Sequence, residues 1–240
     1  MKNILIPTTL QQDSLFSVKA AIKQAADSKC IITLILLSDA PDMESASYYL
    51  RKAKYRISKG QQDVLNNCRK EIDTTENCIL DIHYQFGLSA PLLKNLLEHL
   101  STNLIIIPAS YKMELNKIHR YFLNYISNNK IPILHLTDTS EEQEFNKALY
   151  LENKKTLLDV HEVHKMVNTQ FRFKIVSHAA INDNNEELVP QLEEAISKNN
   201  IDLVIETRRP TKLCSKKNSG ITVNNTLGLP VLSLYEEISI

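Results

Sequence analysis

The feature that most constrains the fold is a regular alternation of strand-like and helix-like segments. Apolar, β-rich runs lie at residues 4–7, 31–37, 79–86, 104–107 and 131–136, and a segment with apolar residues at helical spacing follows each of the first four. Continuous apolar runs of this kind are typical of strands buried on both faces of a parallel sheet. The alternation therefore predicts a doubly wound, mostly parallel α/β sheet with right-handed crossovers, in which the longest helix spans about residues 45–72.

A second and shorter set of elements follows a polar stretch. Residues 137–146 (TDTSEEQEFN) have no apolar periodicity and indicate a linker. Beyond them the pattern predicts strands at 148–151, 171–178, 201–206 and 231–234, with helices at 157–167 and 186–197. We therefore predict a first domain at residues 1–138, a linker at 139–146 and a second domain at 147–240.

The two halves are related by an internal repeat. The segment NLIII from Asn103 corresponds to DLVI from Asp202, and IPILHL from Ile131 corresponds to LPVLSL from Leu229. The second half is shorter by about one strand and one long helix, so it looks like the same unit with one βα segment deleted. A half this small gains stability by burying apolar surface on its sister, which predicts an internal pseudo-dimer with the closing strands around Ile133 and Val231 at or near the interface.

Composition excludes several classes of protein. The 28 Lys and Arg residues balance the 28 Asp and Glu residues, so no overall field attracts nucleic acid or an anionic membrane. No apolar stretch is long enough to span a membrane, and the first residues lack a secretion signal, so we expect a cytoplasmic protein. The cysteines lack CxxC or paired metal-ligand spacing and are expected to be buried thiols; they are Cys30, Cys68, Cys78 and Cys214.

In the order and spacing of its motifs the chain resembles the universal stress protein family in its tandem, two-repeat form. The resemblance is carried by NILIPTTL from Asn3, Phe86-Gly87, NLIIIPAS from Asn103 and IPIL from Ile131. It extends over residues 2–137 and, more loosely, 147–235. It implies two Rossmann-like domains of the adenine nucleotide alpha hydrolase-like type, and a binding or regulatory role in the stress response.

The same resemblance implies that family-type ATP binding is lost. ATP-binding members carry an Asp just after the first strand and a glycine-rich loop after the fourth, whose backbone amides approach the phosphates. Here Thr9 stands at the Asp position, and the loop at 108–112 (PASYK) has no glycine. The matching loop of the second half, residues 207–220, has a glycine only at its end. We expect no bound cofactor.

Two groups of residues are candidates for ligand binding. A basic loop past a predicted strand could hold a small anionic ligand with side-chain cations instead of glycine amides. The alternative is a solvated connection between two elements. In both cases we expect that replacing the two arginines of the loop with alanine leaves the stability of the unliganded protein nearly unchanged. A polar pocket at the strand ends of the first half is the second candidate; the alternative there is side chains that bond the local backbone. The candidates are Arg208, Arg209, Lys212, Lys216 and Lys217 in the loop, and Thr8, Thr9 and Ser110 in the pocket.

A pair of histidines and a group of basic residues are expected to form solvent-exposed helix surface and no binding site. His161 and His164 do not meet the HExxH zinc pattern, so we expect an exposed helix face and no metal site. The basic residues Arg51, Lys52, Lys54, Arg56 and Lys59 spread around a helix without an RNA-binding motif, so no nucleic acid is expected.

No nucleophile–base pair indicates an enzyme, and we assign no catalytic residue. The function expected is therefore non-enzymatic binding or regulation through an unidentified protein partner or a small anionic ligand. A nucleotide or phosphate sensor that uses residues 208–217 and a protein-interaction scaffold remain as alternatives, and a homodimer remains open.

Overall fold

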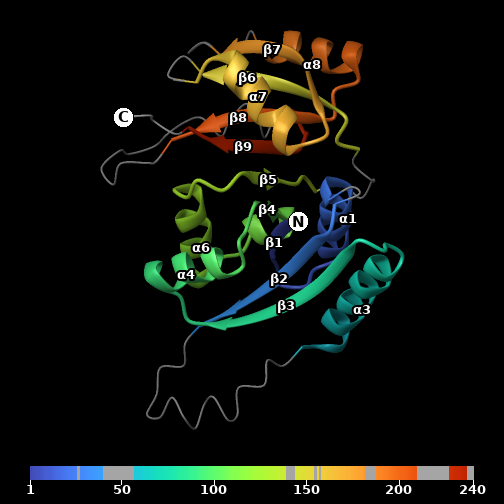
Figure 1. Ribbon diagram of the computed structural model, residues 1–240, viewed down its shortest axis with the longest axis vertical. Helices are drawn as coiled ribbons and strands as arrows, with labels where there is room; N and C mark the ends of the chain where they lie inside the picture. Colours follow the sequence, from blue (N-terminus) through green and yellow to red (C-terminus); the bar gives the residue numbers. More distant parts are fainter. Residues whose placement is uncertain are drawn as a thin grey trace. The chain divides into compact units, whose positions relative to one another are not determined.

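The structure is a computed structural model, and it describes residues 1–25, 28–39, 57–138, 144–153, 156, 158–181, 188–209 and 227–236. The chain forms two compact units, Met1–Tyr125 and Ile126–Ile240 (Figure 1). Each unit is a sheet with helices and is described separately below. Within the described residues, no helix combines the length and the apolar character that a membrane span needs.

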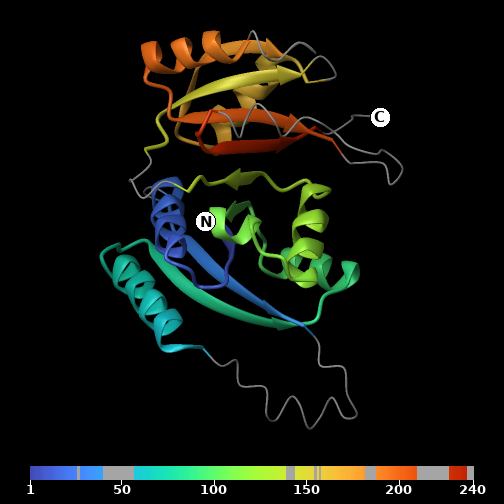
Figure 2. The ribbon, with the colours of Figure 1, turned by 180° about the vertical axis from the view of Figure 1, so that it is seen from behind.

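The first unit is a parallel sheet in the order β3-β2-β1-β4. Figures 1 and 2 show α1 and α3 on one face of this sheet, as right-handed crossovers between β1, β2 and β3 require. Helix α6 begins in this unit and ends in the second. The elements are β1 (Lys2–Pro7), α1 (Asp13–Ala25), β2 (Cys30–Ser38), α3 (Lys59–Asp73), β3 (Cys78–Phe86), α4 (Ala90–His99), β4 (Leu104–Ile107), α5 (Ala109–Lys112) and α6 (Lys117–Ser127).

Local sequence signals account for the ends of several helices. Ser58 precedes α3 and forms a capping box with Gln61, in which each side chain bonds the other residue's backbone N–H. Ser89 caps α4 through the backbone N–H of Leu92, and Pro91 occupies the first turn, where its missing N–H costs nothing. The central strands β1, β2 and β4 are almost entirely buried, which fits their unbroken apolar sequences.

The second unit is a sheet in the order β5-β9-β8-β6-β7. All neighbouring strands are parallel except β5 and β9, which pair antiparallel. The chain runs from β6 out to β7 and back over β6 to β8, so α7 and α8 cover opposite faces. The elements are β5 (Ile133–His135), β6 (Lys147–Asn153), α7 (Val160–Gln170), β7 (Lys174–Ile181), α8 (Leu188–Asn199), β8 (Leu203–Arg208) and β9 (Val231–Tyr235).

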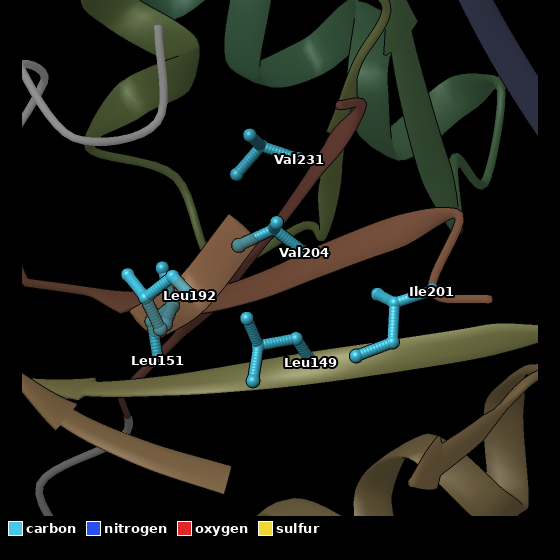
Figure 3. Close-up of a cluster of buried hydrophobic side chains, with 6 residues drawn as sticks. All are labelled: Leu149, Leu151, Leu192, Ile201, Val204 and Val231. Carbon is cyan, nitrogen blue, oxygen red and sulfur yellow. The ribbon is translucent and has the colours of Figure 1, made fainter. Parts of the chain in front are cut away.

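One face of this second sheet carries an apolar core. Register places Leu149 of β6, Val204 of β8 and Val231 of β9 side by side in neighbouring strands. Helix α8 covers them with Leu192, and Leu151 and Ile201 complete the cluster (Figure 3). The opposite face carries Tyr150, which is directly opposite His178 of β7 and Ile205 of β8.

The architecture confirms the predicted fold class. Both sheets are doubly wound and mostly parallel, and the second has one strand–helix segment fewer between its first strand and β8 than the first has before β4. The closing strands of the two repeats pair directly, with Leu134 opposite Leu232. The packing of the halves as a pseudo-dimer stays a prediction.

The unit boundary lies earlier than the predicted linker. It falls between Tyr125 and Ile126, because β5 pairs with β9 and so clusters with the second repeat. Residues 139–143 of the predicted linker lie outside the described residues, as do residues 45–56 of the predicted long helix, whose described part is α3.

Candidate functional site

The candidate site of the first unit lies where the sheet order changes direction. Strand β1 has β2 on one side and β4 on the other, so successive connections leave toward opposite faces. In open α/β sheets, ligands bind outside the carboxyl ends of the strands at such a point. Thr8 and Thr9 follow β1 and Ser110 follows β4, so the topology brings all three predicted residues to this edge.

Both the backbone and the side chain of Thr8 make hydrogen bonds with neighbouring residues. Its backbone N–H donates to the carbonyl of Ile35 at 3.0 Å. Its Oγ1 lies 2.7 Å from Ser14 Oγ and accepts from the backbone N–H of Leu10 at 2.8 Å. The residue is 1% exposed. Thr8 therefore stabilises the turn from β1 into α1.

Thr9 and Leu10, which follow Thr8, are also held within the protein. The carbonyl of Thr9 accepts from Gln61 Nε2 of α3 at 3.0 Å, and the buried Thr9 Oγ1 makes no hydrogen bond with a described residue. Leu10 has a φ of 59°, a left-handed conformation that costs a leucine roughly 1–2 kcal/mol. Its side chain is only 2% exposed. The burial of this side chain compensates for the backbone strain.

Ser110 is bonded to a carboxylate of the protein itself. Its backbone N–H donates to Asp13 Oδ2 at 2.8 Å, and its hydroxyl bonds Asp13 Oδ1 at 2.7 Å. Pro108, which directly follows β4 and precedes α5, has no N–H to donate and makes no side-chain cap. The carboxylate of Asp13 thus occupies the backbone amide and the hydroxyl of Ser110, close to the carboxyl end of β4.

A buried polar cluster lies just beyond Ser110. Tyr111 is fully buried and its hydroxyl lies 2.9 Å from His119 Nδ1 of α6. Burial lowers the pKa of His119, while Glu114 and Asp39 raise it by smaller amounts. Sequence reasoning missed this cluster because its members share no recognisable motif.

In the second unit, Arg208 is a structural residue at the carboxyl end of β8. Its Nε donates to the carbonyl of Ser127 at 3.2 Å and its Nη2 to that of Asn129 at 2.8 Å. It also donates to the carbonyls of Ile131 and Ser233. Burial lowers the pKa of the guanidinium to about 10, so it stays charged at neutral pH. Arg208 thereby ties the end of α6 to β8 and β9.

Arg209 has a different environment. Its Nε donates to Glu236 Oε2 at 2.6 Å, and the carboxylate side chain is only 2% exposed. Its Nη2 is buried and makes no hydrogen bond with a described residue. A buried guanidinium N–H without a partner is costly, so this atom is a candidate donor to an acceptor at the edge of the sheet.

Three hydroxyl groups lie on the same side of β6 and β8. Tyr150 is fully buried, and burial raises its pKa, as do Glu152 and Glu236. The hydroxyls of Thr156 and Thr207, which are 3.2 Å apart, lower that pKa, yet Tyr150 Oη makes no hydrogen bond of normal geometry within the described chain. Tyr150 Oη and Arg209 Nη2 are thus two buried polar atoms that make no hydrogen bond of normal geometry with a described residue.

The remaining candidates are dispersed or outside the described residues. His161 is exposed and His164 is half-buried on α7. The described residues hold no cluster of three or more His, Cys, Asp or Glu that could ligate a metal. Lys59 is exposed at the start of α3. Those outside the described residues are Lys212, Lys216 and Lys217 of the basic loop and Arg51, Lys52, Lys54 and Arg56 of the basic helix.

Comparison of the sequence with known protein families and with curated proteins finds no match. Comparison of the structure with solved structures finds proteins of similar fold. A universal stress protein from Archaeoglobus fulgidus superposes with a TM-score of 0.57 at 10% identity, over 99% of this chain and 97% of that chain. A Pseudomonas aeruginosa protein of unknown function gives a TM-score of 0.48 at 12% identity, over 98% of this chain and 92% of its own.

The two doubly wound sheets place the chain among α/β proteins that carry polar residues at the carboxyl edge of a parallel sheet. The superposition on the Archaeoglobus protein covers both repeats, so the chain has the universal stress protein fold. The resemblance predicted from sequence is confirmed at the level of the fold.

Proposed function

We propose that this protein is a non-enzymatic binding or regulatory protein of the stress response, whose first repeat does not bind ATP in the manner of the family's ATP-binding members. The fold supports the general class. The absence of a nucleophile–base pair in the sequence supports a role without catalysis.

The observation that carries the proposal is the contact between Asp13 and Ser110. A carboxylate that accepts both the backbone N–H and the hydroxyl of Ser110 satisfies the donors that a phosphate would need there. A phosphate entering this position would also meet the negative charge of Asp13. Thr9 provides no carboxylate, and Leu10 occupies the turn with a buried side chain. ATP binding would therefore require the loops after β1 and β4 to rearrange.

A thermal-shift titration tests this proposal. A ligand at a hundredfold its Kd stabilises a protein by about 2.7 kcal/mol, which is easily measured. The wild-type protein is titrated with Mg-ATP, AMP, cyclic nucleotides and inorganic phosphate. We expect no shift from ATP that depends on the first repeat. An ATP-induced shift in the wild type that a folded Ser110→Pro variant removes would contradict the proposal.

A second candidate function is supported by the second repeat. Arg209 Nη2 and Tyr150 Oη make no hydrogen bond of normal geometry with a described residue, and with the nearby hydroxyls of Thr156 and Thr207 they favour a small-ligand sensor at the carboxyl edge of β6 and β8. A ligand oxygen that accepts from Arg209 would satisfy one of these atoms. This candidate depends on Arg209 and not on Arg208, whose guanidinium is bonded to four backbone carbonyls.

The same titration distinguishes the two functions. If the second repeat is a sensor, a ligand of the panel shifts the melting temperature of the wild type, and Tyr150→Phe reduces that shift while leaving the buried ring in place. No shift with any ligand of the panel favours the regulatory or scaffold function, in which the partner is a protein.

A further inference from the structure

Two buried thiols lie side by side at the amino edge of the first sheet. Cys30 is the first residue of β2 and Cys78 is the first residue of β3, and the two are directly opposite each other in the parallel register. Cys30 is 2% exposed and Cys78 is 7% exposed. Because directly opposite residues project to the same face of a sheet, both side chains lie under the same helices. The pair is far from the carboxyl edge discussed above.

The thiols are in contact and have a cation beside them. A side-chain hydrogen bond joins Cys30 and Cys78, and burial, with a smaller contribution from Cys78, raises the pKa of Cys30 to about 12. Lys2 of β1 is directly opposite Cys30 on the other side, and its charge favours the thiolate. Lys2 Nζ is held at 2.6 Å from the carbonyl of Gln24 in α1. Three strands thus present an ammonium and two thiols in one row.

The spacing of parallel strands suits a metal ion between the sulfurs better than a disulfide. Neighbouring strands lie about 4.8 Å apart, and side chains of opposite residues leave them in nearly the same direction. A disulfide needs Cβ atoms only about 3.8 Å apart and sulfurs in covalent contact. Two metal–sulfur bonds of about 2.3 Å, arranged in line, separate the sulfurs by about 4.6 Å. Such a bridge needs little movement of either strand.

The number and type of ligands select the ion. Structural zinc takes four ligands, and no third His, Cys, Asp or Glu joins this pair in the described part of the chain. Soft thiolate ligands favour Cu(I), which is satisfied by two of them in a linear arrangement. Burial keeps water from completing a larger coordination shell.

From this geometry we propose that Cys30 and Cys78 form a two-coordinate site for Cu(I). Binding replaces both thiol protons: Cu⁺ and two R–SH give [RS–Cu–SR]⁻ and two H⁺, with no change of oxidation state. The product carries one negative charge, which the ammonium of Lys2 balances across the row. The proposed copper site is independent of the proposed function, because it lies at the opposite edge of the sheet.

The test is anaerobic titration of the reduced protein with Cu(I) against the chromophoric chelator bathocuproine disulfonate. All variants carry Cys214→Ser, because Cys214 lies outside the described residues. We expect one ion per chain, bound at least tenfold more weakly in Cys30→Ser and in Cys78→Ser. Cys68→Ser is the matched control, because Cys68 is also fully buried but is no partner of the pair. Lys2→Met should weaken binding several-fold.

X-ray absorption at the copper edge keeps the proposal testable if a serine variant does not fold. The folded, copper-loaded Cys214→Ser protein should show two sulfur neighbours and no nitrogen or oxygen neighbours. Three or more ligands would overturn the proposal. So would the absence of binding, retention of full affinity in Cys30→Ser, or loss of binding in Cys68→Ser.

Discussion

At the scale of single residues, two adjacent arginines show how position on a strand decides the role of a side chain. Arg208 and Arg209 project to opposite faces at the end of β8. Arg208 bonds four backbone carbonyls, and Arg209 pairs with the buried carboxylate of Glu236. The sequence shows only two neighbouring cations in a basic loop. The partners of Arg208 lie as far as 81 positions away in the sequence, so no local pattern indicates them.

These contacts replace the expectation that the arginines can be removed without loss of stability. Arg208→Ala should lower the free energy of unfolding by roughly 3 kcal/mol, because several buried carbonyls lose a charged donor together. Arg208→Lys should recover only part of this loss, since an ammonium cannot reproduce the planar fork. Urea unfolding measures both values. Lys165→Ala, at an exposed position of α7, is the control, and an Arg208→Ala variant as stable as this control would contradict the assignment.

The buried His119 predicts a pH dependence of stability. Burial lowers its pKa in the folded protein below the ordinary value of 6.5, so the unfolded chain binds more protons below that pH. The contribution of neutral His119 is present above pH 6.5 and is lost as the pH falls below it. Unfolding free energies measured from about pH 7.5 to about pH 5 should fall more steeply in the wild type than in His119→Phe. Equal slopes would show that burial does not lower the pKa of His119 in the folded protein.

At the scale of elements, apolar runs and caps made most strands and helices predictable. The predicted strand at 104–107 is β4, and the run at 131–136 contains β5 (Ile133–His135). The short helix α5 was not predicted, because four residues carry no periodicity. The pairing of strands was predictable only in part. The repeat indicated that β5 and β9 are equivalent strands, but only the structure shows that they pair with each other in antiparallel orientation.

The pairing of β5 with β9 makes Val231 a sensitive position. Val231 is opposite His135 of β5 and Val204 of β8, and it is 8% exposed within the apolar cluster of the second unit. Val231→Asp should lower the free energy of unfolding by roughly 3 to 5 kcal/mol, because it buries an unpaired charge. Val176→Asp of β7 is the matched control, because that valine is 44% exposed. Equal melting temperatures for the two variants would contradict the placement of β9.

At the scale of the whole molecule, the sequence predicted the fold class and the loss of the glycine loop, but not what replaces it. The repeat order and the glycine-free loop at 108–112 are visible in one dimension. The bonds between Asp13 and Ser110 join residues 97 positions apart, and a first-turn Asp looks like an ordinary helix cap. Such long-range contacts decide whether a strand edge is open to a ligand.

The proposed function depends on the carboxylate of Asp13, which bonds the backbone N–H and hydroxyl of Ser110 after β4 in the first repeat. The most direct measurement is mass spectrometry of the small molecules released when the freshly purified protein is denatured. We expect that neither ATP nor ADP is released in an amount comparable with the protein. Release of about one nucleotide per chain, lost in a Ser110→Pro variant that remains folded, would contradict it.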